Sequence, residues 1–145
     1  MINIYTKAGT LKGNSIISII LKSQKYRWVK AFRINQDLPK NSFTKSVTLD
    51  ALGILYALKH IKDRYKKKKV ILYSDSTHIS SALNTKHGEY VNKTKIHAIE
   101  CLRDVIGTFS NITVKNFSNK CEHKDELEHI FVECALDRIE IDEKD

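Results

Sequence analysis

The sequence contains few cysteines and no long apolar segment. Its three cysteines, Cys101, Cys121 and Cys134, have no repeated spacing, which argues against a disulfide framework. The longest apolar run, residues 16–21, is interrupted by Ser18 and is far shorter than the roughly 20 residues of a membrane-spanning helix. The first residues lack the basic and apolar regions of a signal peptide. We therefore expect a cytoplasmic protein that does not insert into a membrane.

Acidic residues are scarce in the first two thirds of the chain. The whole sequence has 25 Lys and Arg against 17 Asp and Glu, a net charge of +8. Residues 1–95 hold 19 basic and 5 acidic residues, whereas residues 96–145 hold 6 and 12. A basic body suits binding to a phosphate backbone. A Lys-rich composition with a solvated acidic tail is an equally good explanation, so charge alone leaves both alternatives open.

Hydrophobic periodicity predicts the element order β-β-β-α-β-α-α-β-α in one domain. Period-two and continuous apolar patterns predict strands over residues 2–7, 15–21, 26–34, 70–73 and 112–114. Helical spacing predicts helices around residues 51–61, 77–83, 96–106 and 125–138. Turns are expected at residues 8–9 and 12–14, because both contain glycine. Residues 139–145 read as a frayed acidic tail, and no repeats or second domain are visible.

Three short motifs at element ends resemble the RNase H family. Residues 72–76, Leu-Tyr-Ser-Asp-Ser, are similar to the family's fourth strand, which ends in Ser/Thr-Asp-Ser, so the resemblance marks Asp75. Residues 4–9, Ile-Tyr-Thr-Lys-Ala-Gly, match the context of its first strand, but Lys7 replaces the aspartate. Asp50 stands seven residues before an Ala-Leu pair, where the family has a glutamate. The resemblance covers about residues 2–138.

The fourth family site, on the last helix, fits in two registers. The family has Asn-Glu-x-x-Asp there, and one register puts His129 in the place of the aspartate. A rival register matches Asp-Glu-Leu literally and puts Asp125 there, but it places Glu128 and Phe131 where small residues are wanted. We favour His129.

The resemblance implies an α/β, RNase H-like domain over residues 1–138. Its sheet would be five-stranded and mixed, with three antiparallel N-terminal strands and helices on both faces. The family hydrolyses the RNA strand of RNA/DNA hybrids with two Mg²⁺ ions held by carboxylates. By the same resemblance Asp50 and Asp75 are the metal-ligand candidates, and Asp50, Asp75, His129 and Lys7 are the candidate catalytic residues.

The incomplete carboxylate set leaves three functions open. A protonated Lys7 is no ligand, and it repels the two cations that the family holds there. The first reading is therefore a catalytically impaired pseudo-nuclease that binds an RNA/DNA hybrid or double-stranded RNA, with no metal or weakly bound Mg²⁺ or Mn²⁺. The second is an active ribonuclease H, in which Lys7 is a fixed cation and Asp50, Asp75 and His129 hold one ion. The third is a protein-interaction module that binds a partner chain.

Other residue groups suggest binding sites more weakly. Four basic residues are candidates for phosphate contacts: Lys12, Arg27, Lys66 and Lys67. Tyr26 and Trp28 are candidates for stacking on bases, although alternate aromatic residues on a strand more often belong to the core. A zinc site can be drawn from Cys121, His123, His129 and Cys134, but its spacing fits no standard finger.

Overall fold

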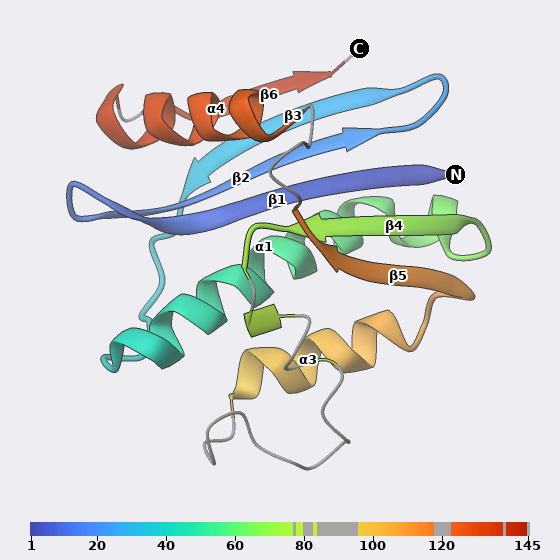
Figure 1. The fold of residues 1–145 in the computed structure, drawn as a ribbon, viewed down its shortest axis with the longest axis horizontal. Coiled ribbons are helices and arrows are strands. Elements are labelled where there is room, and N and C mark those ends of the chain that lie inside the picture. The colour runs from blue at the N-terminus through green and yellow to red at the C-terminus, as the bar shows by residue number, and fades with distance from the viewer. Residues whose placement is uncertain (77, 80–82, 84–95, 118–122, 138, 145) are drawn as a thin grey trace.

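A six-stranded mixed sheet forms the centre of the computed structural model, which describes every residue except 77, 80–82, 84–95, 118–122, 138 and 145 (Figure 1). The strands lie in the order β5-β4-β1-β2-β3-β6. β1, β2, β3 and β6 are successively antiparallel, while β4 pairs in parallel with both β1 and β5. The strand bounds are β1 Ile2–Leu11, β2 Asn14–Lys22, β3 Arg27–Arg33, β4 Lys69–Ser74, β5 Asn111–Asn116 and β6 Ile141–Lys144.

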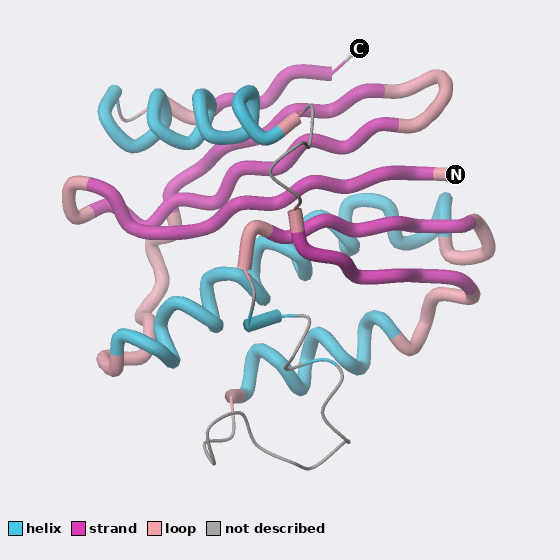
Figure 2. Tube along the Cα trace, viewed as in Figure 1, coloured by secondary structure: helices cyan, strands magenta, loops and turns pink. Residues whose placement is uncertain are grey.

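Helices cover both faces of this sheet, as Figure 2 shows. α1 (Ser42–Tyr65) and α3 (His97–Ile106) lie on one face, and α4 (Lys124–Asp137) lies on the other. Each face has its own hydrophobic cluster, one built around α1 and α3 and the other around α4. None of the described helices is long and apolar enough to cross a membrane.

The continuous apolar run of β2 follows from its place inside the sheet. Ile17, Ile19 and Leu21 point into the cluster on the α1 face, while Ile16 and Ile20 point into the cluster under α4. A strand buried on both faces needs apolar residues at every position, not at alternate ones. The polar residue that interrupts the run, Ser18, is fully buried and donates to the carbonyl of Leu127 at 3.2 Å.

The two turns predicted in the first hairpin have different outcomes. Lys12 and Gly13 have φ values of 52° and 79°, the two positive angles of a type I′ turn, so the turn at residues 12–14 is confirmed. The turn at residues 8–9 is wrong, because Ala8 and Gly9 continue β1 and pair with β2. A β-carbon at Gly9 would lie 3.4 Å from Cζ of Phe131, so this glycine fits under α4 instead of turning the chain.

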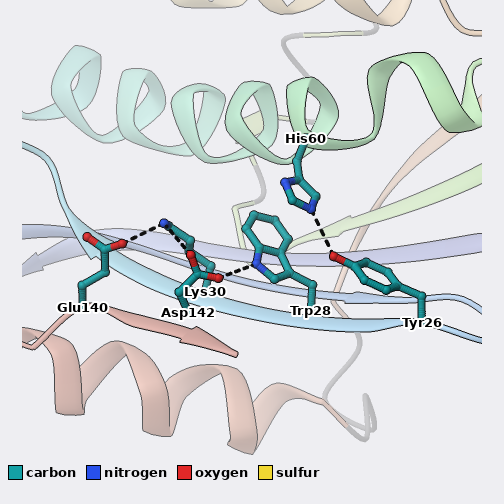
Figure 3. Close-up of polar contacts among 6 residues, drawn as sticks. All are labelled: Tyr26, Trp28, Lys30, His60, Glu140 and Asp142. Atoms are coloured by element: carbon teal, nitrogen blue, oxygen red, sulfur yellow. Dashed lines mark hydrogen bonds and ion pairs between the residues drawn. The ribbon is translucent and has the colours of Figure 1, made fainter. Parts of the chain in front are cut away.

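The C-terminal residues differ most from expectation. Residues 139–145 were expected to fray, but Ile141–Lys144 forms β6 against the outer edge of β3, so the sheet has six strands and not five. The reason lies in the side chains of β3. The ammonium of Lys30 lies 2.8 Å from Glu140 and 3.2 Å from Asp142, and Nε1 of Trp28 donates to Asp142 at 2.7 Å (Figure 3).

The long first helix carries one candidate site residue, Asp50. It starts after the proline-containing loop, where the side chain of Asn41 accepts a hydrogen bond from the backbone N–H of Thr44 at 3.1 Å. Most of the helix predicted over residues 77–83 lies outside the described residues. The helices predicted around residues 96–106 and 125–138 correspond to α3 and α4 with small shifts of their ends, whereas α1 extends well beyond the predicted 51–61 at both ends.

Candidate functional site

Lys7 and Asp75 meet because β1 and β4 are parallel neighbours. The register pairs Thr6 with Ser74, so Lys7 of β1 and Asp75, the residue just after β4, lie next to each other. Nζ of Lys7 lies 3.2 Å from Oδ2 of Asp75, and the two side chains are 27% and 28% exposed. The same ammonium lies 4.9 Å from the ring centroid of Phe131 on α4. Lys7, inside β1, and Asp75, just after β4, thus form a half-buried ion pair with an aromatic ring on one side.

Asp50 approaches this pair from α1 and is nearly inaccessible, at 6% exposure. Burial raises the pKa of its carboxyl to about 7, and the negative charge of Asp75 adds to the rise. Hydrogen bonding by Ser76 and the positive charge of Lys7 oppose the rise without cancelling it. Near neutral pH a large share of Asp50 is therefore uncharged, which weakens it as a ligand for a hard cation.

Asp75 is also less acidic than a free aspartate. Loss of hydration raises the pKa of this carboxyl, although Lys7 and the backbone amides of Ala8 and Asp75 lower it. The chain following Asp75 is held locally, since the hydroxyl of Ser74 accepts from the amide of Ser76 at 3.1 Å. The hydroxyl of Ser76 in turn accepts from the amide of His78 at 3.2 Å, as expected for a helix cap.

His129 lies apart from these three residues. Its side chain is 78% exposed, and its Nε2 atom lies 3.4 Å from Glu133 one turn further along α4. The α4 side chain that reaches Lys7 is Phe131, and Asp125 of the rival register is exposed at the start of the helix. Within the described part of the chain, no group of three His, Cys, Asp or Glu side chains is placed to hold a metal ion.

These residues do not fit the two-ion site that the resemblance implies. A pair of Mg²⁺ ions needs several anionic oxygens to offset four positive charges. The described site offers one carboxylate already paired with an ammonium and a second one that is buried and partly protonated. The geometry is that of a salt-bridged pocket. Its described carboxylates carry too little negative charge to offset more than one weakly held cation.

Solved structures settle the fold. LC11-RNase H1, isolated from compost by a metagenomic approach, aligns over 94% of this chain and 96% of its own, with a TM-score of 0.64 and 17% identity. LC9-RNase H1, described as a type 1 RNase H with the type 2 active-site motif, aligns over 96% and 74%, with a TM-score of 0.64 and 10% identity. The chain has an RNase H-like fold. The predicted fold class is therefore confirmed, apart from the added sixth strand.

A third neighbour is LC11-RNase H1 in complex with an RNA/DNA hybrid, which aligns over 88% of this chain and 93% of its own, with a TM-score of 0.60 and 18% identity. The sequence itself matches no protein-family model and no curated protein. The RNase H-like fold was thus recognisable from a few residues at element ends.

The predicted phosphate-contact residues are spread over this RNase H-like fold. Lys12 lies in the β1–β2 turn, and Lys66 and Lys67 follow α1 at the opposite end of the sheet. Arg27, at the start of β3, forms an ion pair with Glu126 of α4. These residues remain predictions, and they do not form one patch.

The residues of the drawn zinc site are also separated or not described. Cys121 lies outside the described residues, and His123 is buried with its ring 4.6 Å from that of Tyr5. Cys134 is buried in the core under α4. The sequence did not point to a second group of basic residues, because its members lie far apart in the chain. This group consists of Lys59 and Arg64 on the last turns of α1 and Lys144 on β6.

Proposed function

We propose that this protein is an RNase H-like nucleic-acid-binding protein whose metal-dependent nuclease chemistry is impaired. The observation that carries the proposal is the 3.2 Å pair between Lys7 and Asp75. At about 4 Å and an effective dielectric near 20, an ammonium repels each unit of metal charge by about 4 kcal/mol. Because Lys7 already compensates Asp75, the pocket is close to neutral without metal.

The net charge of +8 and the fold support binding to a phosphate backbone. A neighbour of the same fold, LC11-RNase H1, has been solved with an RNA/DNA hybrid. For this chain we therefore propose an RNA/DNA hybrid or double-stranded RNA as the ligand.

Calorimetric titration with Mn²⁺ tests the impaired site. We expect the wild type to show no tight two-site binding. Lys7→Asp removes the ammonium and supplies a carboxylate at the strand end, so Mn²⁺ affinity should rise at least tenfold, about 1.4 kcal/mol. Lys12→Asp makes the same charge change in the exposed hairpin turn and should leave metal affinity unchanged. Tight binding of two ions by the wild type would reject the proposal.

A cleavage assay on an RNA/DNA hybrid with Mg²⁺ and with Mn²⁺ tests the alternative of a rearranged active nuclease. We expect no cleavage by the wild type. If cleavage occurs and Asp75→Asn abolishes it, the nuclease reading replaces ours; cleavage that survives Asp75→Asn comes from a contaminant. An electrophoretic shift assay at two salt concentrations tests binding itself, and no shift at low salt would favour the protein-interaction module.

A further inference from the structure

A basic pocket lies beside the last turns of α1, away from Lys7 and Asp75. It has a volume of about 380 Å³. Lys59, His60 and Arg64 contribute from α1, Tyr26 from the segment before β3, and Lys144 from β6. The β3–β6 register places Lys144 directly opposite Trp28, so the C-terminal strand completes the pocket.

Among the side chains that the structure describes, the lining of this pocket has cations and no carboxylate. Its lining includes three permanently basic side chains and no acidic one. Among the described residues, none forms an ion pair with Lys59, Arg64 or Lys144. The carboxylate whose charge reaches the pocket, Asp142, is held by Nε1 of Trp28 at 2.7 Å and by Lys30 at 3.2 Å (Figure 3). Asp142 also interacts electrostatically with Lys144, and the described side chains that line the pocket carry a net positive charge.

The aromatic wall of the pocket is fixed by packing. The ring of His60 stacks on Trp28 with centroids 3.7 Å apart, and its Nε2 atom lies 3.2 Å from the hydroxyl of Tyr26 (Figure 3). Trp28 beneath it is only 2% exposed, so the stack rests on the core. A ligand meets hydrogen-bonding groups that are already held in place, which lowers the entropic cost of binding.

We propose that this pocket binds a phosphate group, presented either by a nucleic-acid strand or by a free nucleotide. Clustered Lys and Arg side chains give charge-assisted hydrogen bonds to phosphate oxygens, and tyrosine rings beside them offer faces for a base or sugar. The volume lies near the lower end of ligand pockets, about 300–1,000 Å³, which fits one nucleotide unit. The proposal goes beyond the Lys7–Asp75 site, and its failure would leave the metal titrations unchanged.

Binding measurements with matched variants test this assignment. The probes are adenosine monophosphate, adenosine without phosphate, and a labelled single-stranded oligonucleotide of about 12 nucleotides. Arg64→Gln/Lys144→Gln removes two pocket cations. Lys115→Gln/Lys124→Gln removes the same charge from β5 and from the first residue of α4. Thermal unfolding of both variants checks that they are folded.

We expect the pocket variant to lose at least about tenfold in oligonucleotide affinity relative to the control variant. The slope of log affinity against log salt should also become shallower by about 0.7 for each lost contact with a single strand. Trp28 is the only tryptophan, so its fluorescence should change on binding. Pocket-dependent binding of adenosine monophosphate, but not adenosine, assigns the phosphate to a free nucleotide; binding of the oligonucleotide alone assigns it to a strand. Equal affinity of the two variants for every probe overturns the proposal.

Discussion

At the scale of single residues, the central feature is the ion pair between Lys7 and Asp75. Lys7 pairs with Asp75 and lowers the pKa of Asp50 by its charge. The charge of this one side chain therefore affects both carboxyl groups, because buried charges interact strongly when little water screens them. Ionisation of Asp50 is unfavourable in the folded protein, because its carboxylate is poorly hydrated there.

The raised pKa of Asp50 predicts a specific pH dependence of stability. The folded protein holds this proton up to about pH 7, whereas the ordinary pKa is 3.8. The stabilising contribution is therefore complete below about pH 4 and is lost as pH rises through about 7. Asp50→Asn mimics the neutral form, so its free energy of unfolding relative to the wild type should improve by about 2 kcal/mol between pH 5 and pH 8.

Urea unfolding at the two pH values measures this difference. Asp37→Asn, in the exposed loop before α1, is the control and should show no comparable change. If the difference between Asp50→Asn and the wild type is the same at both pH values, the buried carboxyl is ionised in the fold.

His60 should report its protonation through Trp28. Burial lowers its pKa below 6.5, and Lys144, Lys30 and Arg64 add to the effect while Asp142 opposes it. Since the two rings are stacked, a protonated imidazole should quench the indole. We expect the fluorescence of Trp28 to fall only below pH 6.5, and His60→Gln to abolish this titration. A midpoint above 6.5 would contradict the described surroundings of His60.

At the scale of elements, β6 is the part whose role is least evident from its own residues. Its four residues are mostly polar, yet they cover the edge of β3 and satisfy Lys30 and Trp28. An uncovered edge strand is open to pairing with other chains. The acidic segment therefore becomes the outer strand of the sheet, covers the edge of β3 and does not trail into solvent.

Asp142→Ala should destabilise the protein by about 1–3 kcal/mol, because Nε1 of Trp28 loses its acceptor and Lys30 keeps only Glu140. Glu143→Ala, on the same strand and equally exposed but outside the contacts with Trp28 and Lys30, is the matched control and should cost less than about 0.5 kcal/mol. Chemical denaturation followed by Trp28 fluorescence measures both. Equal effects of the two changes would mean that β6 is held by its backbone alone.

At the scale of the whole molecule, the acidic third of the chain folds onto the basic body. Glu126 pairs with Arg27, and Glu140 and Asp142 pair with Lys30. These internal pairs remove some cations from the surface and leave others, such as Lys59, Arg64 and Lys144, available. The fold, and not the order of residues in the chain, therefore determines where the positive charge lies on the surface.

This distribution predicts that hybrid binding depends steeply on salt. If about six phosphates are contacted, affinity should fall roughly 10³-fold between 50 and 200 mM salt. Fluorescence anisotropy with a labelled RNA/DNA hybrid measures the dependence. An affinity that does not change with salt would show that phosphate contacts contribute little.

The sequence by itself determined the main elements and the class of fold. The apolar run of β2 and the helical spacing between Ala51 and Ile61 are local patterns that follow from burial. Each therefore predicts its strand or helix without knowledge of the residues packed against it. The motif around Asp75 was likewise recognisable, because it spans only a few consecutive residues at the end of β4. These features depend on neighbours within a few residues.

Only the tertiary structure decided what lies far apart in the chain. Lys7 and Asp75 are separated by 68 positions and Lys30 and Asp142 by 112, so no local pattern records their contact. Tertiary packing likewise turned His129 to solvent and brought Phe131 to Lys7, because the buried face of α4 is set by the sheet beneath it. Burial and charge neutralisation act through space, and these two effects determined the sheet edge, the candidate site and the basic pocket.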